Sequence, residues 1–83
     1  MEYRYRESVL SELVRHGVCP GSETPPDVVH EFVNDLYRYE IRTLREKMRG
    51  GLIPKADYAS RVRELRDRYP VLSLPADYWT VNH

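Results

Sequence analysis

Two stretches of the chain place hydrophobic residues at the same intervals on either side of a Gly-Gly pair. Each stretch advances by four, three and four residues, a spacing that puts side chains on one face of an α-helix. The hydrophobic positions are Tyr37, Ile41, Leu44 and Met48 before the glycines and Tyr58, Val62, Leu65 and Tyr69 after them. Two apolar helical faces joined by a short turn bury each other as an antiparallel hairpin. The pattern therefore predicts helices over about residues 25–49 and 54–69 that form a central antiparallel helical hairpin.

The ends of the longer helix carry recognisable signals. Thr24 is a residue type that caps helix N-termini, Pro25 suits the first helical position, and Asp27 suits the first turn. Gly50–Gly51 is typical of a helix C-terminus, because glycine adopts the left-handed backbone found there. We therefore predict that Thr24 caps this helix and that the helix continues without a break to Arg49.

The apolar face of the long helix changes direction along its length. Its first half is apolar at Val29, Phe32, Val33 and Leu36, about 100° around the axis from the stripe of its second half. A shorter amphipathic pattern predicts a helix over about residues 7–16, with Gly17 placed to end it. We expect this first helix to pack near Phe32, and the helix over 54–69 to pack along residues 41–48.

The C-terminal tail is apolar and contains two prolines. Pro70 ends the preceding helix, and the residues that follow include Val71, Leu72 and Trp79. We predict an extended C-terminal strap laid over the hairpin. The fold class is therefore all-α, with three helices and this strap in a single small domain covering residues 1–83.

Composition and charge narrow the function classes. The 83 residues include 13 basic and 13 acidic side chains, so no net charge draws the chain to nucleic acid or acidic lipid. The lone Cys19 excludes an internal disulfide and does not point to an oxidising compartment. The first seven residues resemble no signal peptide, and no apolar run approaches the roughly 20 residues needed to cross a bilayer. We expect a cytoplasmic protein that does not bind membranes.

The sequence contains no constellation typical of a catalytic or metal site. His16, Cys19 and His30 are the candidate metal ligands, but they lack the close pairs that structural zinc sites use. The sequence also lacks a nucleophile elbow, a phosphate-binding glycine loop and a Cys/His pair with an orienting group. We therefore predict no cofactor, no metal and no enzyme activity.

Most basic residues of this chain are arginines, and four of them follow the spacing of a helix face. The positions Arg38, Arg42, Arg45 and Arg49 repeat the four-three-four step and form a strip beside the apolar face of the long helix. Together with Arg61 and Arg68 on the next helix, this strip is a candidate surface for phosphate groups or for a partner, because guanidinium groups bind phosphate bidentately. The alternative interpretation is that the arginine stems cover apolar surface while their charged ends stay in water.

A local resemblance covers residues 44–65. The segment Leu44-Arg45-Glu46-Lys47-Met48-Arg49-Gly50-Gly51-Leu52-Ile53, followed by Asp57-Tyr58 and Leu65, resembles the short helical hairpins of the SHOCT type. It departs from that pattern at Pro54-Lys55, where the family usually has Ser or Thr and then acids. The resemblance implies an oligomerisation or binding role and carries over no catalytic residues.

These observations favour a small cytoplasmic module for protein–protein interaction or oligomerisation. Val28 and Tyr39 lie outside the faces assigned to the neighbouring helices, so we expect them at the interface of a homodimer. The seven tyrosines fit either such an interface or the rim of a thin core. The main alternative is a nucleic-acid-binding accessory protein that uses the arginine strip, and a third reading is a subunit that completes a larger enzyme.

Overall fold

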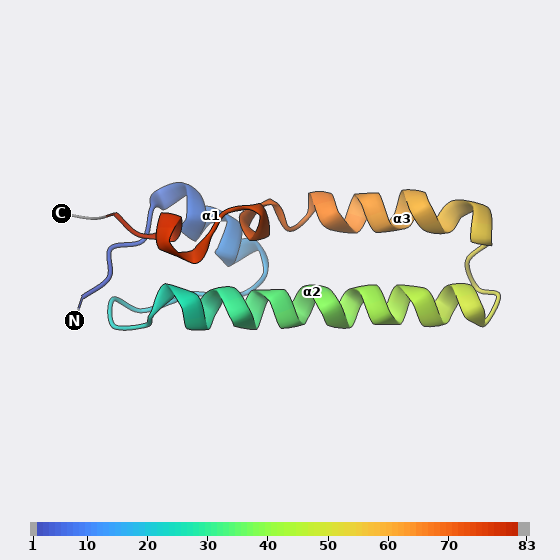
Figure 1. The fold of residues 1–83 in the computed structure, drawn as a ribbon, viewed down its shortest axis with the longest axis horizontal. Coiled ribbons are helices and arrows are strands. Elements are labelled where there is room, and N and C mark those ends of the chain that lie inside the picture. Colours follow the sequence, from blue (N-terminus) through green and yellow to red (C-terminus); the bar gives the residue numbers. More distant parts are fainter. Residues whose placement is uncertain (1, 82–83) are drawn as a thin grey trace.

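The structure is a computed structural model that describes residues 2–81, and these form three α-helices and two short 3-10 helices (Figure 1). The elements are α1 (Glu7–Arg15), α2 (Pro26–Arg49), α3 (Lys55–Asp67), η1 (Pro70–Ser73) and η2 (Ala76–Trp79). The predicted all-α fold class is confirmed, and each α-helix begins and ends within two residues of its predicted bounds.

The central antiparallel hairpin is formed by α2 and α3 (Figure 1). At its turn, Gly51 has a φ of +81°, a backbone conformation that glycine adopts without strain. The Leu52 amide donates to the Lys47 carbonyl at 2.8 Å and closes the end of α2. Leu65 and Tyr69 are buried, whereas the facing stripe on α2 is half-buried. The hairpin therefore has two layers and a thin interior.

The N-terminus of α2 differs from the prediction by one residue. The helix begins at Pro26, and Pro25 is the capping residue, with an extended backbone at φ −62° and ψ 137°. A residue before proline is held out of the helical region by the proline ring, so Pro26 excludes Pro25 from the helix. Thr24 is therefore too far away to cap; its hydroxyl accepts a hydrogen bond from the Gly21 amide at 3.1 Å instead.

The C-terminal tail is not an extended strap over the hairpin. It folds into η1 and η2, which pack against α1 and the first half of α2. Trp79 is fully buried, and its indole nitrogen donates to the Val71 carbonyl at 3.2 Å. The tail is compact because Pro70 and Pro75 each fix a backbone angle that suits the start of a 3-10 turn, and because the Trp79 ring needs burial with a partner for its N–H.

The tail also changes how α1 meets α2. We expected α1 to pack near Phe32, but that side chain is 53% exposed, and Val29 and Val33 are the buried residues of this part of α2. The 3-10 helices contact both α1 and α2, so the tail occupies the place that the prediction gave to α1. The Arg6 amide donates to the Trp79 carbonyl at 2.9 Å, which ties the N-terminal segment to the tail.

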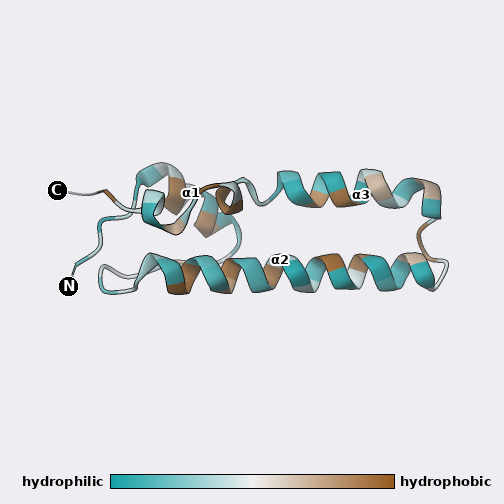
Figure 2. Ribbon diagram, viewed as in Figure 1, coloured by the Kyte–Doolittle hydropathy of each residue, from teal (hydrophilic) through white to brown (hydrophobic). Residues whose placement is uncertain are grey.

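The molecule has two parts of different density. We call residues 2–37 and 69–81 the head, and residues 38–68 the hairpin. Buried hydrophobic side chains concentrate in the head, and apolar residues also line the facing sides of the hairpin helices (Figure 2). The chain measures 50 × 18 × 16 Å, and its radius of gyration is 15.2 Å, against about 12 Å expected for a compact domain of this size. The hairpin thus projects from the head.

We expect the two parts to respond differently to loss of an apolar side chain. Trp79→Ala should destabilise the protein by about 3–5 kcal/mol, because it empties the centre of the head. Leu44→Ala should cost less than half as much, because Leu44 is half-buried in the thin hairpin. Denaturant unfolding followed by circular dichroism measures both values. An equal or larger cost at Leu44 would show that the hairpin, not the head, dominates stability.

Candidate functional site

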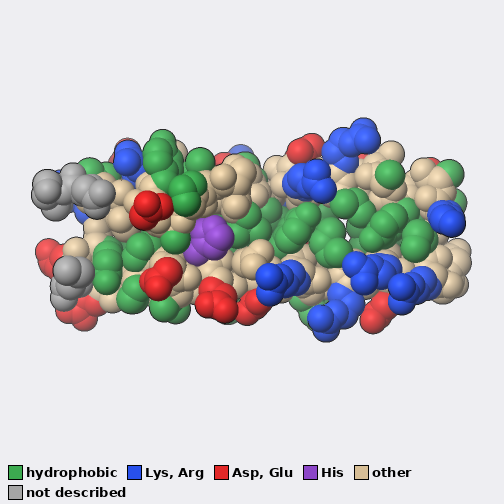
Figure 3. Space-filling view, viewed as in Figure 1, with side chains coloured by type: hydrophobic (Ala, Val, Ile, Leu, Met, Phe, Trp, Pro, Cys, Tyr) green, Lys and Arg blue, Asp and Glu red, His purple; other side chains and the backbone are tan. Residues whose placement is uncertain are grey.

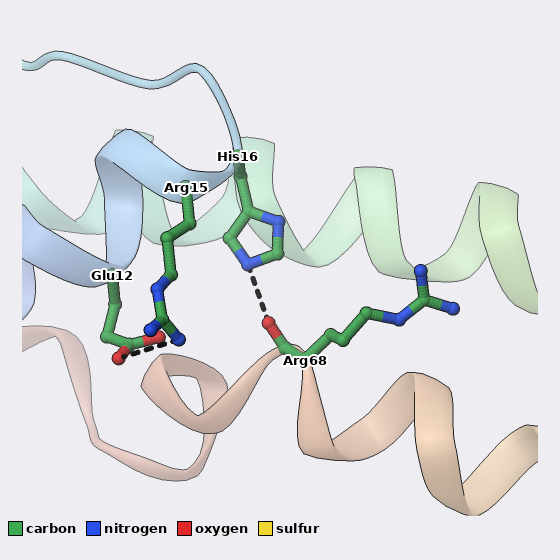
Figure 4. Close-up of polar contacts among 4 residues, drawn as sticks. All are labelled: Glu12, Arg15, His16 and Arg68. Atoms are coloured by element: carbon green, nitrogen blue, oxygen red, sulfur yellow. Dashed lines mark hydrogen bonds and ion pairs between the residues drawn. The ribbon is translucent and has the colours of Figure 1, made fainter.

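The head and the hairpin meet at a cluster of aromatic and polar side chains. The His16 ring stacks on Tyr69 with the ring centroids 4.1 Å apart and the planes inclined by 15°. Its Nε2 donates to the Arg68 carbonyl at 2.7 Å, while the Arg68 guanidinium points away along α3 (Figure 4). The Tyr37 ring meets the Tyr69 ring edge-on at 5.3 Å. These contacts bind the end of α1 to the end of α3 and fix where the hairpin leaves the head.

Tyr69 also joins α3 to α2 through a hydrogen bond. Its hydroxyl donates to a carboxylate oxygen of Glu40. Burial, together with this hydrogen bond and the Glu40 charge, raises the pKa of Tyr69 from 10.0 to about 12. Burial likewise raises the pKa of Tyr5, whose hydroxyl donates to the Thr24 carbonyl at 2.6 Å. Both phenols therefore serve as neutral hydrogen-bond donors in the fold.

Three of the polar side chains at this junction make contacts within the protein. A surface depression of about 560 Å³ is lined by residues that include Arg15, His16, Glu40 and Tyr69. Arg15 lies 3.7 Å from the Glu12 carboxylate (Figure 4), His16 donates to a backbone carbonyl, and Glu40 accepts from Tyr69. His16 and Glu40 therefore join the two parts of the molecule, whereas the Arg15–Glu12 pair lies within α1.

The three metal-ligand candidates lie in different surroundings. His16 belongs to the junction, His30 packs against the Trp79 ring at 4.9 Å, and Cys19 is exposed in the loop between α1 and α2. Within residues 2–81, no group of three or more His, Cys, Asp or Glu side chains is placed to hold a metal ion. In the same part of the chain, no helix combines the length and the apolar character that a membrane span requires.

The zero net charge conceals a strong separation of charge. The hairpin holds ten of the 13 basic side chains but five of the 13 acidic ones, which gives it a formal charge of +5. The rest of the chain carries three basic and eight acidic side chains, which gives −5. Basic side chains gather at the hairpin end and acidic ones near the head (Figure 3). A local field is therefore present that the net charge alone does not reveal.

The arginine strip lies on one broad face of the hairpin. Each strip residue directly follows a residue of the α2 apolar stripe, so the strip lies about 100° around the helix from α3. An antiparallel pair is related by an approximate two-fold axis, so positions that follow the α3 stripe lie on this same face. There α3 contributes Arg63 and Arg66, with Lys55 at its first turn. We define the basic face as Arg38, Arg42, Arg45, Arg49, Lys55, Arg63 and Arg66.

The structure places Arg61 and Arg68 on the opposite face of the hairpin, away from the strip. These residues precede members of the α3 stripe, and they line a surface depression together with Glu40, Lys47 and Glu64. The opposite face mixes both signs of charge: Lys47, Arg61 and Arg68 accompany Glu40, Asp57 and Glu64. Sequence reasoning grouped arginines by helix spacing alone. An arginine that directly follows a stripe residue lies on the face of the strip, and one that directly precedes a stripe residue lies on the opposite face. This rule identifies Arg63 and Arg66 as further members of the basic face.

A third surface lies on the side of α2 that points away from α3. Val28, Phe32 and Tyr39 share this side and are 56%, 53% and 67% exposed. We call these three residues the outer stripe. Val28 and Tyr39 are the two positions that the sequence analysis assigned to an interface, and Phe32 joins them because the tail, not this side chain, completes the head.

Comparisons of the chain with protein-family models, with curated proteins and with solved structures found no match.

The alkaline titration tests the Tyr69–Glu40 contact. Folding raises the pKa of Tyr69 from 10.0 to about 12, so the neutral phenol stabilises the fold below pH 10, and this contribution is lost as the pH rises towards 12. Tyr69→Phe should flatten the fall of stability over this range and remove one late-ionising phenol from the ultraviolet titration. Tyr78→Phe, which removes an exposed phenol, is the control. If the phenol that Tyr69→Phe removes from the titration ionises near pH 10 and not near pH 12, the contact is refuted.

Proposed function

We propose that this protein is a non-catalytic, cytoplasmic protein-interaction module that pairs with a second copy through the outer stripe of α2. The observation that carries the proposal is the stripe itself, in which three large apolar side chains of one helix face are more than half exposed. Large exposed apolar side chains that share one side of a helix are typical of protein interfaces. The thin hairpin interior supports the proposal, because small domains gain stability from association.

The charge pattern of α2 favours an antiparallel pair. The first half of the helix carries Asp27, Glu31 and Asp35 with no basic side chain except His30. Its second half carries five basic residues, from Arg38 to Arg49, against two acidic ones. Antiparallel pairing sets each acidic half beside the basic half of the second copy, whereas parallel pairing sets like charges together. Opposite charges across an interface steer association and select its orientation.

The outer stripe suggests a register for this pair. Pairing Val28 of one copy with Tyr39 of the other puts the two-fold axis between residues 33 and 34, with Phe32 of both copies close to it. In that register, Arg38 of one copy lies level with Val29 of the other, about 3 Å along the axis from Glu31 and within reach of its carboxylate. Arg38 is free to turn towards it, since its pairing with Asp35 in the same chain is long at 3.8 Å and exposed. A two-fold axis repeats every such contact, the commonest arrangement in soluble dimers.

The local resemblance to SHOCT-type hairpins implies the same class of role. The exposed Cys19 thiol also fits the reducing interior of the cell, where free cysteines persist. The alternative function, nucleic-acid binding, is favoured by the basic face, which gathers cations without an equal number of carboxylates.

Sedimentation equilibrium tests the pairing. We expect the wild-type chain to approach twice its 9.9 kDa mass at high micromolar concentration and its melting temperature to rise with concentration. Phe32→Glu should give a monomer at every concentration, because it places two like charges beside the two-fold axis. Leu52→Glu is the matched control, since Leu52 is 78% exposed at the hairpin turn and lies far from the stripe. A wild-type monomer with a concentration-independent melt contradicts the proposal.

A charge exchange tests the orientation. Glu31→Arg and Arg38→Glu should each weaken dimerisation between about two- and thirty-fold, because each change affects two symmetric pairs of exposed charges. The double variant should recover most of the loss, since it restores opposite charges in the antiparallel register. If the double variant is weaker than both single variants, the antiparallel register is wrong.

A further inference from the structure

The basic face surrounds a shallow apolar groove that runs along the hairpin. Half-buried side chains from the facing sides of both helices form its floor: Tyr37, Ile41 and Met48 from α2, and Tyr58 and Val62 from α3. Near the middle of α2, Ile41 lies in a depression of about 250 Å³ that Arg42 and Arg45 also line. Green apolar surface lies between two rows of blue basic side chains in this view (Figure 3).

Both rims of the groove carry the same sign of charge. The α2 rim carries the arginine strip, and the α3 rim carries Lys55, Arg63 and Arg66, all of them exposed. The nearby acids Glu46 and Asp67 lie on the outer sides of their helices, about 180° from the apolar stripes. The groove therefore offers an apolar floor to a ligand and a row of cations to each of its edges.

From this arrangement we infer that the basic face is a binding site for an acidic amphipathic helix of another protein. Such a helix would lay its apolar side on the floor and set Asp or Glu residues against both rims, which completes a three-helix bundle. Floor contacts supply affinity through apolar burial, and the rims supply orientation and selectivity for an acidic ligand. α3 has 13 residues and is about 20 Å long, so the groove accommodates roughly four turns of a ligand helix.

The composition of the floor distinguishes this ligand from a nucleic acid. A duplex would contact the rims through its phosphates and leave the floor facing water, and a single strand would stack bases on Tyr37 and Tyr58 alone, whereas an amphipathic helix covers both floor and rims. The opposite face of the hairpin provides an internal comparison, because its mixed charges favour no single sign of ligand. The site also lies about 100° around α2 from the outer stripe, so a dimer formed through that stripe engages Arg38 of the basic face and leaves the rest of the groove open.

The test uses a synthetic helical peptide of about 18 residues, with Leu at the two core positions of each heptad and Glu at the positions that flank them. Its affinity for the full-length protein is measured by fluorescence anisotropy. A peptide of the same design with Lys in place of Glu, a DNA duplex and a single-stranded oligonucleotide serve as competing probes. We expect the Glu peptide to bind and the Lys peptide not to bind, with an affinity that falls as salt is added.

Two double variants locate the site. Arg63→Gln with Arg66→Gln should weaken the Glu peptide about ten-fold, because each lost surface pair is worth up to about 1 kcal/mol. Arg61→Gln with Arg68→Gln is the matched control, since it removes the same charge from exposed positions of the same region but on the opposite face. Circular dichroism of each variant verifies that the fold is retained, and the control should bind within two-fold of wild type.

Three outcomes overturn the inference. The Glu peptide fails to bind, or both double variants weaken it equally, or the nucleic acids bind through Arg63 and Arg66 while the peptide does not. The last outcome would assign the basic face to nucleic acid instead.

Discussion

Burial of the Trp79 ring is the interaction on which the head depends. The ring is fully buried in the hydrophobic core cluster, and its residue connects segments from both ends of the chain. The indole N–H donates within the tail, to Val71, and the Trp79 carbonyl accepts from the Arg6 amide. A chain of 83 residues buries little apolar surface in total. A large ring that holds the segments near both ends of the chain against α2 therefore supplies a large part of the buried apolar surface of the core.

Closure of the head fixes where the hairpin can go. The tail covers the first half of α2, so α3 is left to cover the second half, and the chain extends to 50 Å instead of folding back on itself. The His16–Tyr69 stack sits at the boundary between these two parts and holds the end of α3 beside the end of α1. The cost of this design is a hairpin of two layers, which leaves one face of its apolar stripes half-covered and the outer side of α2 bare.

Sequence periodicity predicted the helices well because it reports local geometry. The matched stripes on α2 and α3 depend on spacing within each helix. The turn was also predictable, because Gly51 adopts a positive φ that other residues rarely adopt. The tail could not be predicted in the same way. Its position depends on the burial of Trp79 against residues that are distant in the sequence. The prediction for Phe32 was wrong because the tail fills the space that α1 was expected to fill. Thr24 was misassigned for a local reason, since two successive prolines move the cap by one residue.

The faces of the hairpin show how much a count of charges can hide. Equal numbers of acidic and basic residues suggested a chain with no preference for either sign of ligand. The basic residues nevertheless concentrate in the hairpin and the acidic residues in the rest of the chain. Within the hairpin, their positions around each helix place most basic residues without acidic neighbours on one face and mixed charges on the opposite face. The position of an arginine relative to a stripe residue determines the face on which it lies. Arg63 follows Val62 and belongs to the basic face, whereas Arg61 precedes Val62 and belongs to the opposite face of mixed charge. Because a helix advances 100° per residue, α2 presents its apolar stripe, the basic face and the outer stripe in three different directions. A single helix can therefore hold the fold together and still leave two further surfaces exposed.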